Sequence, residues 1–290
     1  MHKFLRAVGF SKIRKKDLEL ITEEIIEHPE LMKVTKDSEG NEFAEFSKSF
    51  GSNVGITVRG TYDENEEFHM EYYFPYAVGT DVSTQEQIDI EKHAEKESFA
   101  GVCDEMRVGV TLIFYLQNVA DFLSEHRKNI HVKNLHGAIL SALSVDGKIL
   151  LPIEQKKAAK MQANNKREKR SQLLAEAREG NEDAIESLTI EDMDTYTSLS
   201  KRITKEDVLS IVSSCFMPYG IESDQYSIIG DILELEEITN SLTNEKLYSM
   251  KVECNDIIFN VTINQNDLLG EPAVGRRFKG NIWMQGMVCL

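Results

Sequence analysis

Residues 153–203 constrain the fold more than any other feature, because they separate two β-rich stretches with a segment that has little apolar surface. The segment is rich in Ala, Lys, Glu, Gln and Arg, which are strong helix formers. Few of these side chains could join a core, so we expect a charged helical connector, interrupted at Gly180. The flanking stretches 1–152 and 204–290 would then each bury a core of their own, and the sequence predicts two domains.

The first domain begins with apolar residues at helical spacing, Leu18, Ile21, Ile25 and Ile26, and Pro29 ends this helix. Three stretches rich in β-branched and aromatic residues follow, 42–50, 53–62 and 66–78, and they predict an antiparallel meander. We expect residues 83–102 to be partly helical and 106–118 to be a buried strand. Residues 138–153 read as two strands around an Asp146-Gly147 hairpin turn.

The second domain starts with apolar residues on one helical face between Val208 and Phe216, which predict a helix. Four strands follow within a short length, at 225–238, 245–255, 256–264 and 276–290, with a tight turn at Asn255-Asp256. So many strands in so few residues predict a small, barrel-like (OB-like) sheet. The predicted fold class is therefore α+β: an N-terminal antiparallel-sheet domain with helices, the connector, and this C-terminal domain.

The charge distribution argues against two classes of partner. The chain carries a net charge of -16, distributed as two acidic domains around residues 156–170, which hold seven basic side chains and one acidic one. An acidic protein repels phosphate backbones, so we expect neither general nucleic-acid binding nor binding to an anionic membrane. The basic segment could anchor an acidic partner, RNA or a membrane surface. It lacks interleaved aromatics and a large apolar face, so docking on its own acidic domains is the favoured alternative.

Four well-separated cysteines and the absence of a signal-peptide pattern predict a cytoplasmic protein with reduced thiols. No apolar run approaches the length of a membrane span. Common catalytic motifs such as GxSxG, HExxH and the phosphate-binding glycine loops are missing, which removes the motif-bearing enzyme classes. We expect no catalytic residues and no cofactor.

One cluster could hold a metal ion. Asp89, His93 and Glu97 follow one another at one-turn spacing, so a helix would present all three on one face. The alternative is a polar helix face with a local ion pair. A second set, His126, His131 and His136, has a spacing of five that suits neither a helix face nor a strand face, and we interpret these as loop histidines.

The last strand carries the strongest candidate for a binding surface. Alternation places Arg277, Lys279, Trp283 and Gln285 on one face and an apolar set on the other. A solitary Trp beside Arg on a polar face could anchor a partner or ligand, since these residues dominate binding hot spots. The alternative is that Trp283 packs under the connector or against the first domain. Tyr72 and Tyr76 could likewise line a ligand pocket or fill a sheet core.

Three stretches resemble a known family: CFMPYGIESDQYSIIGDI (215–232), GEPAVGRRFKGNIWMQGMV (270–288) and the start, MHKFLRAVGFS. They are similar to a family of uncharacterised bacterial proteins, and the similarity runs the length of the chain. This family is a domain of unknown function. The resemblance implies a bacterial cytoplasmic protein but no reaction and no catalytic residues.

Our leading hypothesis from the sequence is a non-enzymatic scaffold that binds an unknown protein partner or itself, through the Trp283 face. The alternative is a small-molecule-binding module with a pocket lined by Tyr72, Tyr76 or Trp283. A third hypothesis is an enzyme with a new, metal-assisted site at Asp89, His93 and Glu97.

Overall fold

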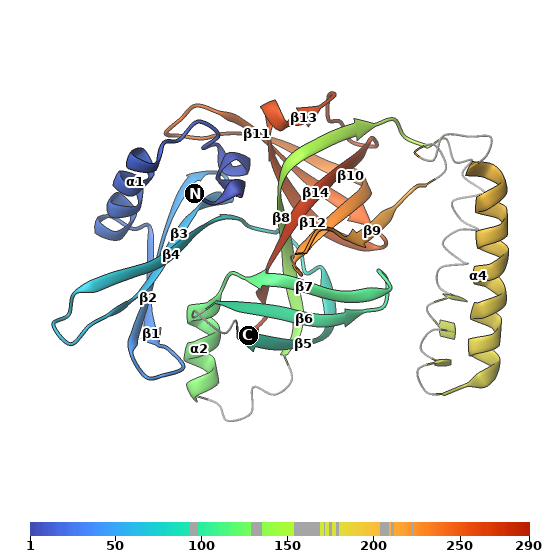
Figure 1. Cartoon of the computed structure of the whole chain (residues 1–290), viewed down its shortest axis with the longest axis horizontal. Helices are drawn as coiled ribbons and strands as arrows, with labels where there is room; N and C mark the ends of the chain where they lie inside the picture. Colours follow the sequence, from blue (N-terminus) through green and yellow to red (C-terminus); the bar gives the residue numbers. More distant parts are fainter. Residues whose placement is uncertain are drawn as a thin grey trace.

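The structure is a computed structural model (Figure 1). It describes residues 1–92, 98–128, 135–153, 180–203, 212–221 and 223–290, together with 169–170, 172–173, 176–177 and 209. These residues are mostly β with a smaller helical part, which confirms the α+β class. Among them, no helix combines the length and the apolar character that crossing a bilayer requires.

The N-terminal part forms a four-stranded antiparallel sheet in the order β1-β2-β3-β4. The predicted meander is confirmed, and the sequence missed only the short first strand. Helix α1 and the 3-10 helix η1 pack their apolar side chains against one face of this sheet, so the opposite face is left for other contacts. The elements are η1 (Lys3–Val8), α1 (Lys15–Glu27), β1 (Leu31–Lys36), β2 (Glu42–Gly51), β3 (Val54–Tyr62) and β4 (Phe68–Ala77).

The remaining strands belong to one ten-stranded sheet. It contains every strand predicted after residue 204, and the Asn255-Asp256 turn is confirmed, with positive φ at both residues. Its strands are β5 (Thr84–Lys92), β6 (Phe99–Glu105), β7 (Val110–Leu116), β8 (Leu135–Leu150), β9 (Cys215–Pro218), β10 (Gln225–Thr239), β11 (Lys246–Cys254), β12 (Ile257–Asn264), β13 (Leu268–Leu269) and β14 (Arg277–Val288). Helix α2 (Val119–Lys128) follows β7, and η2 (Gln265–Asp267) precedes β13.

A long antiparallel ladder between β8 and β14 forms the centre of this sheet, and all of β14 takes part in it. On each side of the ladder, a series of strand pairings begins at β8 and ends at β14. Since β8 and β14 also pair with each other, each series closes a circuit. One circuit runs β8-β12-β11-β10-β14, and the other runs β8-β5-β6-β7-β14. Figure 1 shows them as the upper and lower halves of the central region. Residues 204–290 thus do not complete their circuit alone, because it also needs β8.

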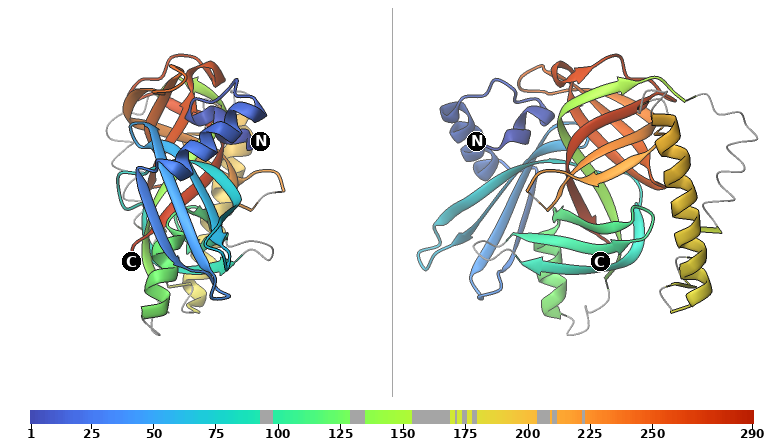
Figure 2. Two further views of the ribbon diagram at one scale, coloured as in Figure 1. Left: turned by 90° about the vertical axis from the view of Figure 1, so that its left-hand side faces the viewer. Right: turned by 45° about the vertical axis from the view of Figure 1, so that its right-hand side comes forward.

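The predicted domain boundaries at residues 152 and 204 lie between β8 and β9, and both strands belong to the ten-stranded sheet. The chain leaves this sheet after β8 and re-enters it at β9. The excursion contains α4 (Glu182–Ile203), which Figure 2 shows at the side of the strands. Gly180 has the positive φ of a helix stop, and Asn181 Oδ1 caps α4 by accepting from the backbone N–H of Asp183 and of Ala184. Most of residues 156–170 lie outside the described residues.

The Asp146-Gly147 hairpin is wrong, because β8 is continuous there. The register shows an extra residue, Val145, between the partners of Asn281 and Ile282. This bulge changes which face successive residues occupy, so that Leu140 and Ile149 pack on the same core. A Cβ on Gly147 would lie 2.6 Å from the Phe278 ring, so this glycine serves close packing rather than a turn.

Two helix predictions are also wrong where the structure describes them. Residues 84–92 form β5, because Ile88 and Ile90 follow the period of a strand despite their helix-forming neighbours. Cys215 and Phe216 belong to β9, which pairs with β10, so the helix expected up to Phe216 does not reach them. In both cases pairing with a neighbouring strand overrides local propensity.

Phe114 fills the second circuit, and two glycines make room for its ring. Gly101 lies opposite Phe114 on β6, and a Cβ there would be 2.2 Å from the ring. A Cβ on Gly286 of β14 would be 2.7 Å from the same ring. The circuit is therefore closed around an aromatic side chain, with bare backbone on two sides.

We predict that Gly101→Ala lowers the free energy of unfolding by about 1–3 kcal/mol, because the added methyl group displaces the Phe114 ring. Urea unfolding measures this loss. The cost should be smaller in a Phe114→Leu background, where the side chain is smaller. Equal costs in both backgrounds would contradict this packing.

Candidate functional site

The candidate site is a cavity of about 380 Å³ between the four-stranded sheet and the ends of β14 and β7. Its floor is the sheet face that α1 does not cover. Its other wall contains the first residues of α2 and the last residues of the chain. The lining residues are Leu31, Lys33, Glu45, Ser47, Thr57, Phe74, Tyr76, Val78, Gln117, Asn118, Asp121, Ile139, Met287, Val288 and Cys289.

Strand register arranges the floor in rows. One row crosses all four strands as Leu31, Ser47, Thr57 and Phe74, and the Ser47 and Thr57 hydroxyls hydrogen-bond at 2.8 Å. In the next row, Tyr76 lies opposite Gly55, where a Cβ would be 2.5 Å from the tyrosine Oη. The Tyr76 ring therefore packs in the space that a side chain at residue 55 would occupy.

A charged row borders the cavity and consists of Lys33, Glu45, Arg59 and Tyr72. The Arg59 side chain is fully buried, and its Nε donates to Glu45 Oε2 at 2.7 Å. It also donates to the Tyr72 and Tyr115 hydroxyls and to the carbonyl of Gln117. Burial by itself would lower the pKa of Arg59, but the Glu45 charge outweighs this and the pKa is raised. This ion pair is therefore a fixed, compensated part of the wall.

Buried amides join the four-stranded sheet to the ten-stranded one behind the cavity. Gln285 of β14 donates to the Pro75 carbonyl and accepts from the Ala77 N–H. Gln117 donates to the Ala77 carbonyl and to Gln285 Oε1. Three of these four bonds reach β4, so they set the distance between the two walls.

Polar contacts also define the mouth. Lys33 Nζ lies 2.7 Å from Asp121 Oδ2, which links β1 to α2. Asn118 both donates to the Val288 carbonyl and accepts from its N–H, and so holds the end of β14. Leu31 and Cys289 are exposed at the rim.

Trp283 is not on an exposed surface as the first hypothesis expected; it is 5% exposed. Its ring stacks on Phe4 at 5.3 Å and contacts His2 and Tyr115, and its Nε1 donates to Asp224 at 2.7 Å. The structure thus has the alternative arrangement, in which Trp283 packs against the first part of the chain.

The other residues predicted with Trp283 do not gather into one surface. Arg277 is buried and donates to the carbonyls of Leu151, Leu209 and Val212, so it binds both ends of the excursion between β8 and β9. Gln285 is fully buried behind the cavity. Lys279 is partly exposed. The expected exposed polar face is therefore wrong for Arg277 and Gln285 as well.

Of the three proposed metal ligands, only Asp89 lies in the described part of the chain. Asp89 lies in β5, so the helical face that would have presented it is absent at this residue. His93 and Glu97 lie outside the described residues. Of the two tyrosines suggested for a pocket, Tyr76 lines the cavity and Tyr72 binds Arg59.

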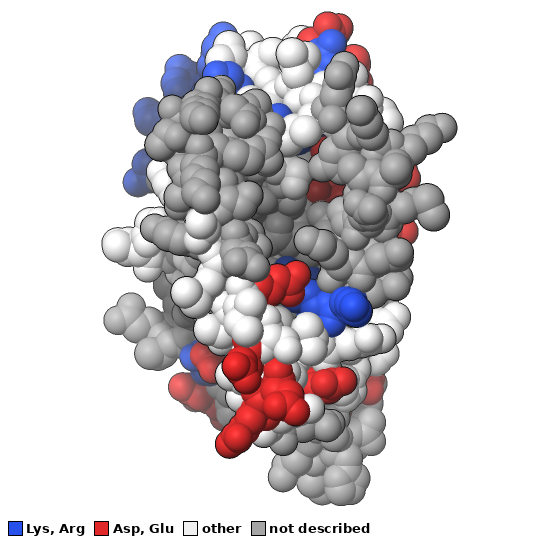
Figure 3. All heavy atoms as spheres, turned by 90° about the vertical axis from the view of Figure 1, so that its right-hand side faces the viewer, with Lys and Arg blue, Asp and Glu red and all other residues white. Residues whose placement is uncertain are grey.

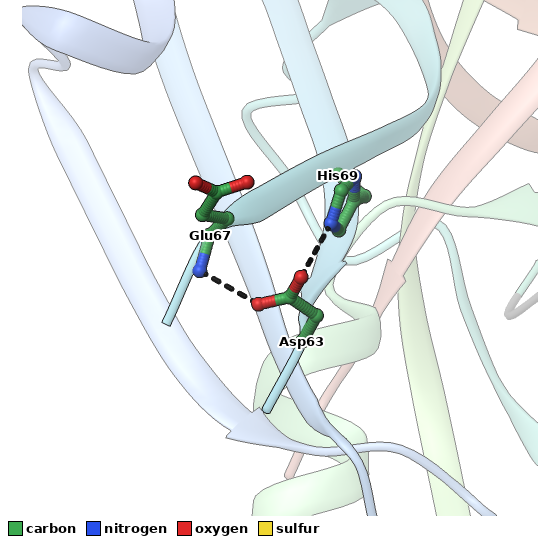
Figure 4. Close-up of side chains that lie close together, drawn as sticks. All are labelled: Asp63, Glu67 and His69. Carbon is green, nitrogen blue, oxygen red and sulfur yellow. Dashed lines mark hydrogen bonds and ion pairs between the residues drawn. The ribbon is translucent and has the colours of Figure 1, made fainter. Parts of the chain in front are cut away.

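A different set of possible metal ligands, Asp63, Glu67 and His69, lies in the β3–β4 hairpin (Figure 4). All three are exposed. Asp63 accepts from His69 Nε2 and from the backbone N–H groups of Asn65 and Glu67. These bonds, that to His69 first, lower the pKa of Asp63 to about 2. They account for the cluster as a hairpin turn, so we assign it no ligand.

Sequence reasoning missed the Glu45–Arg59 pair and the cavity beside it. One signal was present: Glu45 stands between Ala44 and Phe46, and Arg59 directly follows Val58, so each interrupts apolar residues of the predicted meander. Opposite charges in the middle of neighbouring strands favour a cross-strand pair.

Comparison with known proteins identifies a family but no function. A family model described as "Domain of unknown function, E. rectale Gene description (DUF3881)" matches residues 5–286. Neither the curated proteins nor the solved structures contain a match.

We predict acid sensitivity from His2, because burial lowers its pKa from 6.5 to about 4 and its Nδ1 is buried without a hydrogen-bond partner in the described structure. The unfolded chain gains this proton below pH 6.5 and the folded chain only near pH 4. Stability is therefore complete above pH 6.5 and falls by up to roughly 3 kcal/mol as the pH decreases to 4.

Urea unfolding at several pH values, followed by the fluorescence of Trp283, measures this loss. The variant His2→Phe removes the titration and keeps an aromatic ring beside Trp283. An identical decrease for the variant and the unaltered chain between pH 6.5 and 4 would exclude His2 as the source.

Proposed function

The chain belongs to this DUF3881 family of unknown function, and we propose that it binds a small molecule in the cavity between its two sheets. This is the second of the functions that the sequence suggested. The observation that carries it is the cavity itself, with its size and mixed lining. We further propose that the circuit β8-β12-β11-β10-β14 serves as a barrel-like scaffold and that the protein works in the cytoplasm.

The size and lining are typical of a ligand site. Small-molecule pockets are concave, mostly apolar and supplied with a few fixed polar groups. Here Phe74, Val78 and Ile139 are among the apolar lining residues, while Glu45 and the Ser47–Thr57 hydroxyl pair provide polar groups. All of these residues except Val78, which directly follows β4, come from strands of a hydrogen-bonded sheet, which favours a preformed site.

The polar groups favour binding over catalysis. The charged lining residues are already engaged, Glu45 with Arg59 and Lys33 with Asp121. The Ser47 and Thr57 hydroxyls bond each other rather than a general base. Neither hydroxyl is therefore set up as an activated nucleophile, and these groups resemble a recognition surface.

The position of the cavity also supports a binding role. Its walls come from the four-stranded sheet, from α2 and from the end of β14, which are far apart in the sequence. A ligand here would touch both sheets at once, so binding would stabilise their relative position.

Blocking the cavity tests this proposal. Phenol and anisole fit the volume, and saturation-transfer NMR detects their binding to the full chain. We expect Leu31→Trp to abolish the signal, because residue 31 lies at the rim and a larger side chain there fills the mouth.

Val34→Trp is the matched control. Val34 is equally exposed on β1 but does not line the cavity, so binding should persist. Absence of binding to the unaltered chain, or equal binding to both variants, would reject the site.

Our second proposal is that the chain binds a protein partner. The observation that favours it is a group of exposed apolar side chains on α4. Ile185, Ile190 and Met193 expose 48%, 54% and 66% of their surface. Figure 3 looks onto the side of the molecule where α4 lies. Acidic side chains gather on the lower part of this side. We propose that a second copy covers the apolar residues of α4.

Native mass spectrometry of the full chain tests this second proposal. We expect a dimer that Met193→Lys removes, since a charge would be buried in the contact. Ile221→Lys changes a fully exposed apolar residue between β9 and β10, outside α4, and should leave the dimer intact. A monomer for the unaltered chain would contradict the proposal.

A further inference from the structure

The cavity offers a ligand no uncompensated charge. Its charged lining residues are Lys33, Glu45 and Asp121, and Arg59 lies directly behind Glu45. These four charges sum to zero, and each belongs to an ion pair of 2.7 Å. A charged ligand would lose its hydration without gaining a free counter-charge, so this wall disfavours both anions and cations.

Glu45 nevertheless keeps an unused acceptor. Its Oε2 accepts from Arg59, whereas its Oε1 accepts no hydrogen bond from any described residue. The side chain is only 6% exposed and lines the cavity. A carboxylate can accept several bonds, so the spare oxygen is a site for a donor group of a ligand. Bonds to charged acceptors are stronger than those between neutral groups.

Tyr76 supplies a second unused polar group. Its hydroxyl has no hydrogen-bond partner within the described part of the chain, although the residue is only partly exposed. Burial, with the nearby charge of Glu30, raises the pKa of Tyr76 to about 12, so the hydroxyl keeps its proton at neutral pH. Other polar lining groups are better satisfied: Asn118 uses both ends of its amide, and Gln117 Nε2 donates to the Ala77 carbonyl and to Gln285 Oε1.

The shape of the ligand follows from the aromatic floor. Phe74 and Tyr76 stand two residues apart on β4 and so share one face. Ile139, Met287 and Val288 form the apolar wall across from them. A flat ring can lie between these walls with its polar edge toward Glu45.

We infer that the ligand is an uncharged ring compound with a hydrogen-bond donor, which Glu45 Oε1 accepts inside the cavity. This inference rests on the proposed binding function and specifies the chemical class that the site selects. Glu45 is then the residue that determines specificity, and Arg59 is the positioning residue that holds it.

Four probes of similar size separate the possibilities. Phenol is neutral and donates a hydrogen bond, anisole is neutral and cannot donate, benzoate is an anion and benzylammonium is a cation. We expect phenol to bind about tenfold more tightly than anisole, as suits one hydrogen bond to a charged acceptor. Both ions should bind more weakly than phenol. Titrations of the full chain by saturation-transfer NMR give the four affinities.

Two variants test the role of Glu45. Glu45→Gln keeps the shape and can still accept from Arg59, but turns an amide N–H group toward the cavity. The preference for phenol over anisole should then disappear or reverse. Because this change leaves Arg59 without its counter-charge, thermal unfolding must show that the variant folds. Tyr76→Phe is the gentler comparison and should keep the preference for phenol.

The outcomes distinguish this inference from the function on which it rests. If no probe binds, the binding function itself fails. If phenol and anisole bind equally and Leu31→Trp blocks both, the cavity is a binding site but Glu45 does not select donors. Tightest binding of benzylammonium or benzoate would overturn the inference, because it would show an unpaired charge in the wall. If Glu45→Gln does not fold, the phenol-to-anisole ratio of the unaltered chain and of Tyr76→Phe still decides.

Discussion

The ladder between β8 and β14 is the constraint on which the rest of the structure depends. Besides pairing with each other, these two strands each pair along the outer edge with one strand of each circuit. These are β5 and β12 for β8, and β7 and β10 for β14. Both circuits therefore share one register. A slip of one residue would turn every side chain of a strand to the opposite face. The bulge at Val145 belongs to the same arrangement, because it lets Leu140 before it and Ile149 after it face the same core although one number is even and the other odd.

The position of the cavity follows from this ladder. β14 ends beside the four-stranded sheet, and its Gln285 is hydrogen-bonded to β4. The ladder therefore fixes the distance between the ten-stranded and the four-stranded sheet. On that sheet, the buried pair of Arg59 and Glu45 replaces the apolar packing found on the α1 side. A buried ion pair contributes little net stability and is costly to disrupt on one side only. Its presence beside the cavity is consistent with the binding function proposed above.

The sequence predicted the parts of the fold that local pattern determines. The meander, α1 and the C-terminal strands have strong apolar periodicity, and all are present. It did not predict pairing between distant segments. The strand β5 looked helical because Glu, Gln and Lys surround Ile88 and Ile90, and Asp146-Gly147 looked like a turn because its long-range partner Asn281 cannot be identified from sequence.

Of the residues that line the candidate site, the sequence predicted Tyr76. It did not predict the arrangement of the walls. Alternation on β14 correctly separated an apolar face from a polar one, but polar residues usually face water. Here Trp283, Gln285 and Arg277 instead bond to segments that cross over the strand. Nothing local distinguishes a polar side chain that meets solvent from one that meets a buried backbone carbonyl. The cavity adds a further requirement, since its walls come from both sheets and from segments far apart in the sequence.

The guanidinium of Arg277 touches both the residue where the chain leaves the sheet and the residues through which it returns. The excursion between β8 and β9 is thus a loop closed at its base, and its length costs the folded state little, since the entropy of loop closure grows only slowly with length. A peptide bond broken within it would leave each fragment with complete strands, β1–β8 in one and β9–β14 in the other. The hydrogen bonds of the ladder would then hold two separate polypeptides together as they now hold one.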